Sequence, residues 1–505
     1  MKFARMKLVR QYTDCDLFDA SEEATAICYK VKTEYERINT PGEYSINVSR
    51  TPKGYVSLQI LGSGNSWGLL SLLDKQIRLF NVEVGLEQSF AGLEFTTPDG
   101  ICSVKITDAY FDITLDEENS TPYEAGRAYG MAINMMYPEY GDSLEPYLFE
   151  NIKTAFHNIE NDYSPVEERM RTLYDSLDSH YREEIEGLAE GMGITKHGIA
   201  PDGELSVEEL MLAQMVPDSL RPTACSGLSM WGEKTENSDM ISVRCLEWNL
   251  GSDMSMCKIH TVLHIKNYEK SITIIGFLGL FDVISGINDD GVFLAMLDAG
   301  SDQEFVSEGK TCYSFAMRHC LEEYSTAREC GEYMVENSKN FTWSHNIMIT
   351  DGKESYCAED AVEQLLQSGK GFSSLRDNNT PLMKGISWDS PDSLCIINAF
   401  LTEGSYDSMS GIRVNAVRFA KYNEFVKAKD KFDTAAVKDM MTQEIVETDL
   451  YGGATVDNIH RDNLTHMIII DYHSGSVQVA FTGEEGVVDK PVFYEVDNFK
   501  HVSFR

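Results

Sequence analysis

The sequence lacks long apolar runs and has few basic residues. No stretch of roughly eighteen apolar residues occurs in the chain of 505, so we expect no membrane-spanning helix. Residues 1–11 contain no apolar segment like that of a secretory signal peptide, and we expect a cytoplasmic protein. Lysine and arginine total 43 against 81 acidic residues, a net charge of −38. A surface of this charge repels phosphate backbones, which argues against nucleic acid as a partner.

Motifs for metals, cofactors and disulfides are also missing. The 11 cysteines are scattered and include no CxxC pair, which favours a reducing compartment over a disulfide framework. His260 and His264 lie four residues apart in β-branched sequence, without a His-Glu-x-x-His motif, and are better explained as partly buried strand residues. The glycine-rich run 62–68 lacks the lysine of a phosphate-binding loop. We therefore expect neither a metal nor a cofactor.

Three regions follow one another along the chain. Residues 1–117 contain short alternating runs, which predict a β-rich domain of unknown role. Residues 118–224 show helical periodicity, with helix starts expected at Ser164 and Ser206. Residues 225–505 alternate strands with helices, which predicts an α+β layer architecture of sheets covered by helices. Strands in this third region are expected at 271–277, 346–350, 394–398, 466–471 and 477–481, and helices at 313–336 and 412–429.

Cys225 stands where a loop gives way to strand-like sequence. A segment with proline at both ends, 217–222, precedes it, and strand-like runs follow at 228–231 and 240–248. If the Ala224–Cys225 bond is cut, Cys225 carries a free α-amino group beside its thiol. Such an amine has a pKa of about 7.7–8.0 in peptides, so it can act as the general base at neutral pH. The alternative is a buried small apolar residue, the commonest fate of a free cysteine.

The residues around Cys225 resemble the start of the mature chain in linear-amide C–N hydrolases of the N-terminal-nucleophile type. This group includes the bile-salt hydrolases, the penicillin V acylases, the acid-ceramidase-like amidases and the autoproteolytic acyltransferases related to isopenicillin N acyltransferase. Residues 243–248 (VRCLEW) are similar to the family's strand that carries an Arg and, three residues on, an Asp. The matching positions are Arg244 and Glu247, and the second of them departs from the family.

Further motifs appear downstream in the family's order. Residues 286–291 (GINDDG) resemble its Gly-x-Asn-x-x-Gly hairpin, and the next strand ends in Asp298, where bile-salt hydrolases have an oxyanion-stabilising Asn. Residues 393–400 (SLCIINAF) resemble a strand that ends in Asn-His-Phe, so the resemblance makes Asn398 an oxyanion-hole residue.

The resemblance also covers a helix start and a prosegment. Residues 415–419 (NAVRF) are similar to the Ser-x-Arg-Phe helix start of the bile-salt branch, which adds Arg418 to the candidate site. Residues 122–130 (PYEAGRAYG) and 186–191 (EGLAEG) look like prosegment helices of the autoproteolytic acyltransferases. The likeness therefore extends over about residues 118–505.

The resemblance implies a fold and an activity. The fold is a four-layer αββα sandwich formed by residues 225–505, preceded by a helical prosegment-like region, 118–224, and an extra N-terminal β-rich domain, 1–117. The activity is that of a cysteine amidohydrolase or acyltransferase, activated from a zymogen by autoproteolysis, that cleaves a linear amide or thioester of a small acylated substrate. The catalytic residues would be Cys225, Arg244, Glu247, Asp298, Asn398 and Arg418.

Two other functions remain open from the sequence. The departures at Glu247 and Asp298 also suit an uncleaved, catalytically silent binding or scaffold protein of the same fold. A peptidase that pairs unprocessed Cys225 with a distant histidine, His466 being the best candidate, is the second alternative. The acyl group, the leaving group, the choice of water or amine as acceptor, and the oligomeric state cannot be read from the chain.

Overall fold

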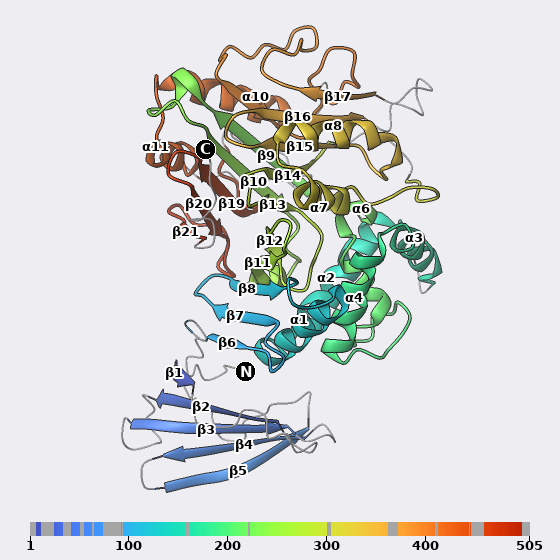
Figure 1. Ribbon diagram of the computed structural model, residues 1–505, viewed down its shortest axis with the longest axis vertical. Helices are drawn as coiled ribbons and strands as arrows, with labels where there is room; N and C mark the ends of the chain where they lie inside the picture. Colours follow the sequence, from blue (N-terminus) through green and yellow to red (C-terminus); the bar gives the residue numbers. More distant parts are fainter. Residues whose placement is uncertain are drawn as a thin grey trace. The chain divides into compact units, whose positions relative to one another are not determined.

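A computed structural model (Figure 1) describes residues 94–157, 162–220, 223–299, 305–361, 372–409, 413–443 and 459–496, together with five strand paths between residues 7 and 73. The side chains of Thr223, Ala224 and Arg413 lie outside the described part. The chain divides into two compact units, Met1–Asp108 and Ala109–Arg505. The predicted boundary at residue 224 is the expected cleavage site between the helical region and the third region, and it stays a prediction.

The first unit consists of antiparallel strands. A sheet of the order β1-β2-β3-β4-β5 is formed by β1 (Lys7–Gln11), β2 (Thr25–Thr33), β3 (Gly42–Arg50), β4 (Tyr55–Gly62) and β5 (Asn65–Leu73). Strands β6 (Glu94–Thr96) and β7 (Cys102–Ile106) pair as a hairpin. In β7 every second residue is buried, as expected for a strand with one face on a core.

The second unit begins with strand β8 (Phe111–Asp116), and a group of helices follows. These are α1 (Pro122–Met136), α2 (Tyr140–Ala155), α3 (Ser164–Tyr174), α4 (Ser179–Met192), α5 (Val207–Ala213) and α6 (Val216–Ser219). Helices α1 and α4 pack backbone to backbone because glycines line the contact on both sides. A Cβ added at Gly130 would overlap the carbonyl oxygen of Leu188, so this spacing requires residues without side chains.

Two sheets follow. One has the order β18-β9-β10-β19-β20-β21, and the other contains β17-β16-β15-β14-β13-β12-β11-β8. The first is built from β9 (Thr223–Met230), β10 (Ile241–Trp248), β18 (Ser393–Ile396), β19 (Leu464–Asp471), β20 (Ser476–Phe481) and β21 (Tyr494–Glu495). The second is built from β8 (Phe111–Asp116), β11 (His260–Lys266), β12 (Ile272–Phe277), β13 (Ser285–Asn288), β14 (Phe293–Asp298), β15 (His345–Thr350), β16 (Ser355–Ala361) and β17 (Phe372–Arg376).

Helices cover each sheet. α7 (Tyr313–Glu323) and α8 (Ala327–Asn337) pack on β13 to β17, and α10 (Arg413–Ala428) packs on β18. α10 and α11 (Thr434–Met441) share a core cluster with one face of β9, β10 and β19. The other face of β9 meets the second sheet, because a Cβ added at Gly227 would lie 2.7 Å from the Met348 sulfur on β15. The expected mixture of sheets and covering helices is confirmed.

Three local expectations are corrected. The single helix expected over 313–336 is two helices, because Tyr324 takes an extended conformation and Thr326 caps α8 by accepting the amide N–H of Glu329. Ser164 is not a capping residue, since α3 begins at Ser164 itself and its hydroxyl donates to Asp162. The helix start expected at Ser206 is confirmed as a capping box, but its helix, for which the sequence pattern predicts an end at residue 217, ends at Ala213.

Candidate active site

Cys225 lies within a strand and is fully buried. β9 already begins at Thr223, so the Ala224–Cys225 bond is part of the sheet, whereas the sequence predicted the end of a loop there. In the antiparallel register with β10, Ala224 pairs with Glu247 and Cys225 with Leu246. The candidate scissile bond is therefore held in extended conformation by its neighbouring strand.

Three side chains from distant parts of the chain contact three different atoms of Cys225. Nη2 of Arg244 lies 3.6 Å from its sulfur. Oδ1 of Asn398 accepts its backbone N–H at 2.7 Å, and Nη1 of Arg418 donates to its carbonyl oxygen at 2.8 Å. The sulfur, the nitrogen and the carbonyl oxygen of one residue are thus each fixed by a separate group, which restricts both its backbone and its thiol.

Arg244 brings a positive charge to the sulfur from the neighbouring strand. It points to the same face as Leu246, two residues away on β10, and hence to the face of Cys225. Its side chain is fully buried, and Nη2 also donates to the carbonyl oxygen of Met296 on β14 at 3.0 Å. Among the described residues, its Nε and Nη1 find no hydrogen-bond partner. A buried guanidinium of this kind favours an anion beside it, such as a thiolate.

Arg418 connects the remaining predicted residues. It lies on α10 and is buried, and its Nη1 forms an ion pair with Glu247 at 2.7 Å. Its Nη2 donates to Oδ1 of Asn398 at 2.6 Å and to Oδ1 of Asn415 at 3.0 Å. Because a guanidinium only donates, this contact requires the oxygen of the Asn398 amide to face Arg418 and the Cys225 nitrogen.

Asp298 takes part through its backbone. Nδ2 of Asn398 donates to the Asp298 carbonyl oxygen at the end of β14. The amide nitrogen of Asn398 carries two hydrogens, so a second N–H remains available in addition to this bond. The six residues predicted from the sequence, Cys225 and five others, therefore come together in one site, although their catalytic roles stay predictions.

Asn415 belongs to the same site but was not predicted. It lies three residues before Arg418 on α10, on the same helix face, and its Nδ2 donates to the Asn398 carbonyl oxygen at 2.7 Å. Its position inside the run 415–419 was the available signal in the sequence. Asn415 thus fixes the backbone of Asn398 while Arg418 fixes its side chain.

His466 does not reach Cys225. It lies on β19, where it pairs with Leu246, which in turn pairs with Cys225. Cys225 and His466 are thus two strands apart, about 10 Å at the usual strand spacing. Nε2 of His466 lies 3.4 Å from the Ser285 hydroxyl, and burial together with the nearby Arg244 charge holds its pKa well below the usual range.

The two histidines at 260 and 264 and the cysteine that follows Arg244 have other surroundings. Nε2 of His260 contacts the carbonyl oxygen of Thr482 at 2.8 Å, and His264 contacts Thr273 at 2.8 Å. The sulfur of Cys245 belongs to the core beneath α10, and burial raises the pKa of its thiol.

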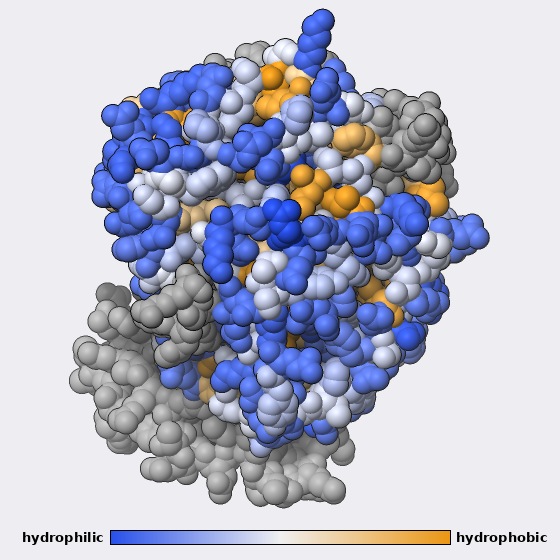
Figure 2. All heavy atoms as spheres, turned by 45° about the horizontal axis from the view of Figure 1, so that its top comes forward, coloured by the Kyte–Doolittle hydropathy of each residue, from blue (hydrophilic) through white to orange (hydrophobic). Residues whose placement is uncertain are grey.

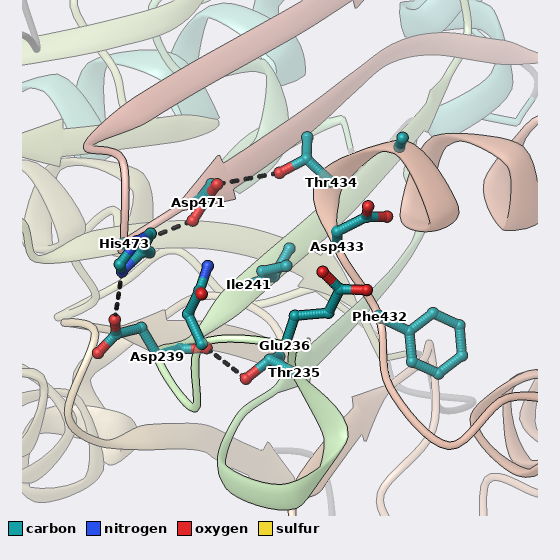
Figure 3. Close-up of a pocket in the computed structure, with 11 residues that line it drawn as sticks. Thr235, Glu236, Asp239, Ile241, Phe432, Asp433, Thr434, Asp471 and His473 are labelled. Carbon is teal, nitrogen blue, oxygen red and sulfur yellow. Dashed lines mark hydrogen bonds and ion pairs between the residues drawn. The ribbon is translucent and has the colours of Figure 1, made fainter.

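A separate acidic cavity lies at the opposite end of β10 and β19. It measures about 200 Å³, and Figure 3 shows the carboxylates and the single imidazole that surround it. His473 contacts Asp239 at 2.7 Å, and Thr434 donates to Asp471 at 3.1 Å. Ile241, at this cavity, is five residues from Leu246, about 17 Å along the strand. The cavity is therefore not part of the Cys225 site.

Hydrophilic residues predominate on the molecular face drawn in Figure 2, where hydrophobic residues form small separate patches. This agrees with the net charge of −38. Within the described ranges, no helix combines the length and apolar character that a bilayer crossing needs.

No protein-family profile and no curated protein matches the sequence. Among solved structures, one match is an ortholog of N-acylethanolamine-hydrolyzing acid amidase from Caenorhabditis elegans, at 10% identity over 49% of this chain and 92% of that chain, with a TM-score of 0.33. A second is the conjugated bile acid hydrolase from Clostridium perfringens, at 14% identity over 55% and 94%, with a TM-score of 0.33. A third is penicillin V acylase from Agrobacterium tumefaciens, at 12% identity over 54% and 86%, also at 0.33.

Proposed function

We propose that the protein is a cysteine N-terminal-nucleophile hydrolase or acyltransferase that cuts its own Ala224–Cys225 bond and then acts on linear amides or thioesters of small acylated substrates. The observation that carries this proposal is the convergence of Arg244, Asn398 and Arg418 on the sulfur, nitrogen and carbonyl oxygen of Cys225. In the fold we infer, the two facing sheets with their covering helices form a four-layer αββα sandwich preceded by an extra N-terminal domain.

The arrangement suits self-cleavage. The Cys225 thiol attacks the Ala224 carbonyl carbon, the peptide C–N bond breaks, and the Cys225 nitrogen takes up the thiol proton. Asn398 already holds this nitrogen through its Oδ1 before cleavage. Water then hydrolyses the thioester and releases a new carboxylate at Ala224. Because Cys225 is fully buried in the uncut chain, cleavage is also the step that gives a substrate access to its thiol.

The same contacts serve turnover after cleavage. The free α-amine, held by Asn398, takes the thiol proton, and Arg244 stabilises the thiolate by its charge. The thiolate attacks the acyl carbonyl carbon, the leaving amine receives the proton back, and a thioester forms on Cys225. Water or an amine then accepts the acyl group. The second N–H of the Asn398 amide is available for the oxyanion, a contribution of about 2.7–4 kcal/mol in comparable sites.

The geometry favours the α-amine over His466 as the base. His466 is two strands from Cys225, and its lowered pKa reflects burial beside Arg244. A proton acceptor must come within hydrogen-bond reach of the thiol, directly or through one water. The Cys225 nitrogen satisfies this requirement within its own residue, which argues against the Cys–His peptidase.

The experiment is a hydrolysis assay with a panel of N-acyl p-nitroanilides of increasing acyl length, each assayed with wild type and with Cys225→Ser and Asn398→Ala variants. We expect wild type to release p-nitroaniline with a hydroxylamine-sensitive acyl-enzyme on Cys225. Asn398→Ala should lower turnover about 100-fold or more, far more than it lowers the folding stability, because the lost donor acts mainly on the transition state. An intact wild-type chain that forms no acyl-enzyme with any panel member would favour the silent scaffold protein instead.

A further inference from the structure

A row of polar side chains crosses three neighbouring strands of the second sheet. Asn346 on β15 pairs with Glu359 on β16, and Glu359 pairs with Ser374 on β17. Directly paired residues of antiparallel strands point to the same face. Asn346 and Glu359 are fully buried, in a position where apolar residues are the rule. Buried polar groups normally have hydrogen-bond partners, so the partners of this row indicate its role.

Asn346 binds the chain on both sides of Asn398. Its Nδ2 donates to the carbonyl oxygen of Ile397 at 2.9 Å and to that of Ala399 at 2.9 Å. These carbonyls belong to the residues immediately before and after Asn398, which itself follows the end of β18 by two positions. One side chain therefore fixes the backbone from which the Asn398 amide projects toward Cys225.

Glu359 holds the residues that follow. Its carboxylate accepts the N–H of Leu401 at 3.0 Å and the N–H of Thr402 at 3.0 Å. Arg376 neutralises this carboxylate and donates to the carbonyl oxygen of Cys395 at 2.9 Å. The whole segment 395–402 is thus attached to the second sheet by buried polar contacts at its start, its middle and its end.

The Asn346 amide is unusual in having only half of its hydrogen-bonding capacity used. Its Oδ1 is buried and has no hydrogen-bond partner among the described residues. A buried acceptor without a partner costs stability, so packing alone does not account for an asparagine here. The donation to the two carbonyl oxygens accounts for the asparagine at this position.

We propose that Asn346 is a positioning residue for the reaction at Cys225, acting through Asn398. The inference rests on the proposed function. The Asn398 side chain must present Oδ1 to the Cys225 nitrogen and an N–H to the oxyanion at the same time, so its backbone tolerates little displacement. A shift of about 1 Å in such a group can cost about 100-fold in rate.

The test is the rate at which freshly translated full-length chain converts into two chains on a denaturing gel. It compares wild type, Asn346→Leu, Asn398→Ala and the double variant. We expect Asn346→Leu to slow cleavage about 10- to 100-fold. The double variant should cleave no more slowly than Asn398→Ala, within about 3-fold, because both changes remove the same positioned amide.

Asn288→Leu is the matched control. Asn288 is also buried, and its Nδ2 also donates to two carbonyl oxygens, those of Leu321 and Tyr324, each at 2.9 Å. These contacts are remote from the segment 395–402. We expect Asn288→Leu to lower the melting temperature at least as much, because its Oδ1 also accepts the N–H groups of Asp290 and Val292. It should nevertheless change the cleavage rate less than about 3-fold.

A second variant covers the case in which Asn346→Leu does not fold. Asn346→Asp has nearly the same volume, but its carboxylate cannot donate to the two carbonyls. Its cleavage rate relative to wild type at the same pH should be low at pH 8 and should rise on acidification, because the protonated acid can donate again to one carbonyl.

The outcomes separate this inference from the proposed function. A wild-type chain that never cleaves removes the proposed function and the inference with it. If wild type cleaves and Asn398→Ala cleaves measurably more slowly, the inference is overturned by an unaffected Asn346→Leu. It is also overturned by a double variant whose loss is the product of the two single losses, since Asn346 would then act independently of Asn398.

Discussion

The ion pair between Glu247 and Arg418 allows a quantitative test of the site. Both side chains are buried, and Nη1 of Arg418 lies 2.7 Å from the Glu247 carboxylate. Glu247→Gln keeps the shape but removes the negative charge, so a buried guanidinium loses its counter-ion. Breaking a buried pair in this way typically costs about 3–5 kcal/mol. Arg418 keeps its oxygen acceptors on Cys225, Asn398 and Asn415, which places the expected loss near the lower limit, about 3 kcal/mol.

The assay is urea unfolding in a Cys225→Ala background, which keeps the chain intact in every variant. The control is Asp389→Asn, which removes an ion pair with Lys427 whose two side chains are about half exposed. Such a pair contributes about 1 kcal/mol or less. Adding Arg418→Met to Glu247→Gln should recover part of the loss, since the uncompensated charge is gone. A loss in Glu247→Gln no larger than that in Asp389→Asn would show that the buried ion pair contributes no more to stability than the exposed one.

Two further predictions concern the helical region before Cys225. Burial raises the pKa of Asp218 to about 7, so the folded state holds a proton that the unfolded state releases near pH 4. The stabilisation that this proton gives, up to about 4 kcal/mol, is therefore present at low pH and is lost as the pH rises to about 7. Asp218→Asn should remove this pH dependence of stability. Parallel curves of stability against pH for the two proteins would contradict it. Gly130→Ala should separate α1 from α4 and cost about 1–3 kcal/mol, measured as thermal unfolding against Gly276→Ala, where an added Cβ meets nothing within 4 Å. Equal melting temperatures for these two alanine variants would show that the close helix packing is not required.

Features set by neighbouring residues were predictable from the sequence. The capping box at Ser206 depends on two side chains three residues apart, and α10 ends within a residue of the helix expected over 412–429. The break between α7 and α8 was not predicted, because no proline or glycine marks it. The signal there is Thr326, which caps the start of α8 and does not by itself indicate that a preceding helix has ended.

Features set by distant residues were predictable only in part. The family resemblance named Cys225 and the five other residues of its site, but no local pattern indicated that Asn346 on β15 would bind the carbonyls beside Asn398. The burial of the Ala224–Cys225 bond in β9 depends on pairing with β10, so the preceding proline-flanked segment suggested a loop instead. Contacts of this kind depend on which strands pair and in which register, and local patterns in a single sequence do not reveal this pairing.

We propose above that Cys225 becomes the first residue of a chain through its own thiol. The most direct measurement is N-terminal sequencing, with intact mass, of the polypeptides in purified wild type and in Cys225→Ala. We predict two chains in wild type, one ending at Ala224 and one beginning at Cys225, and a single uncut chain in Cys225→Ala. A wild-type protein that remains uncut after long incubation, or that begins at any residue other than Cys225, would contradict this account.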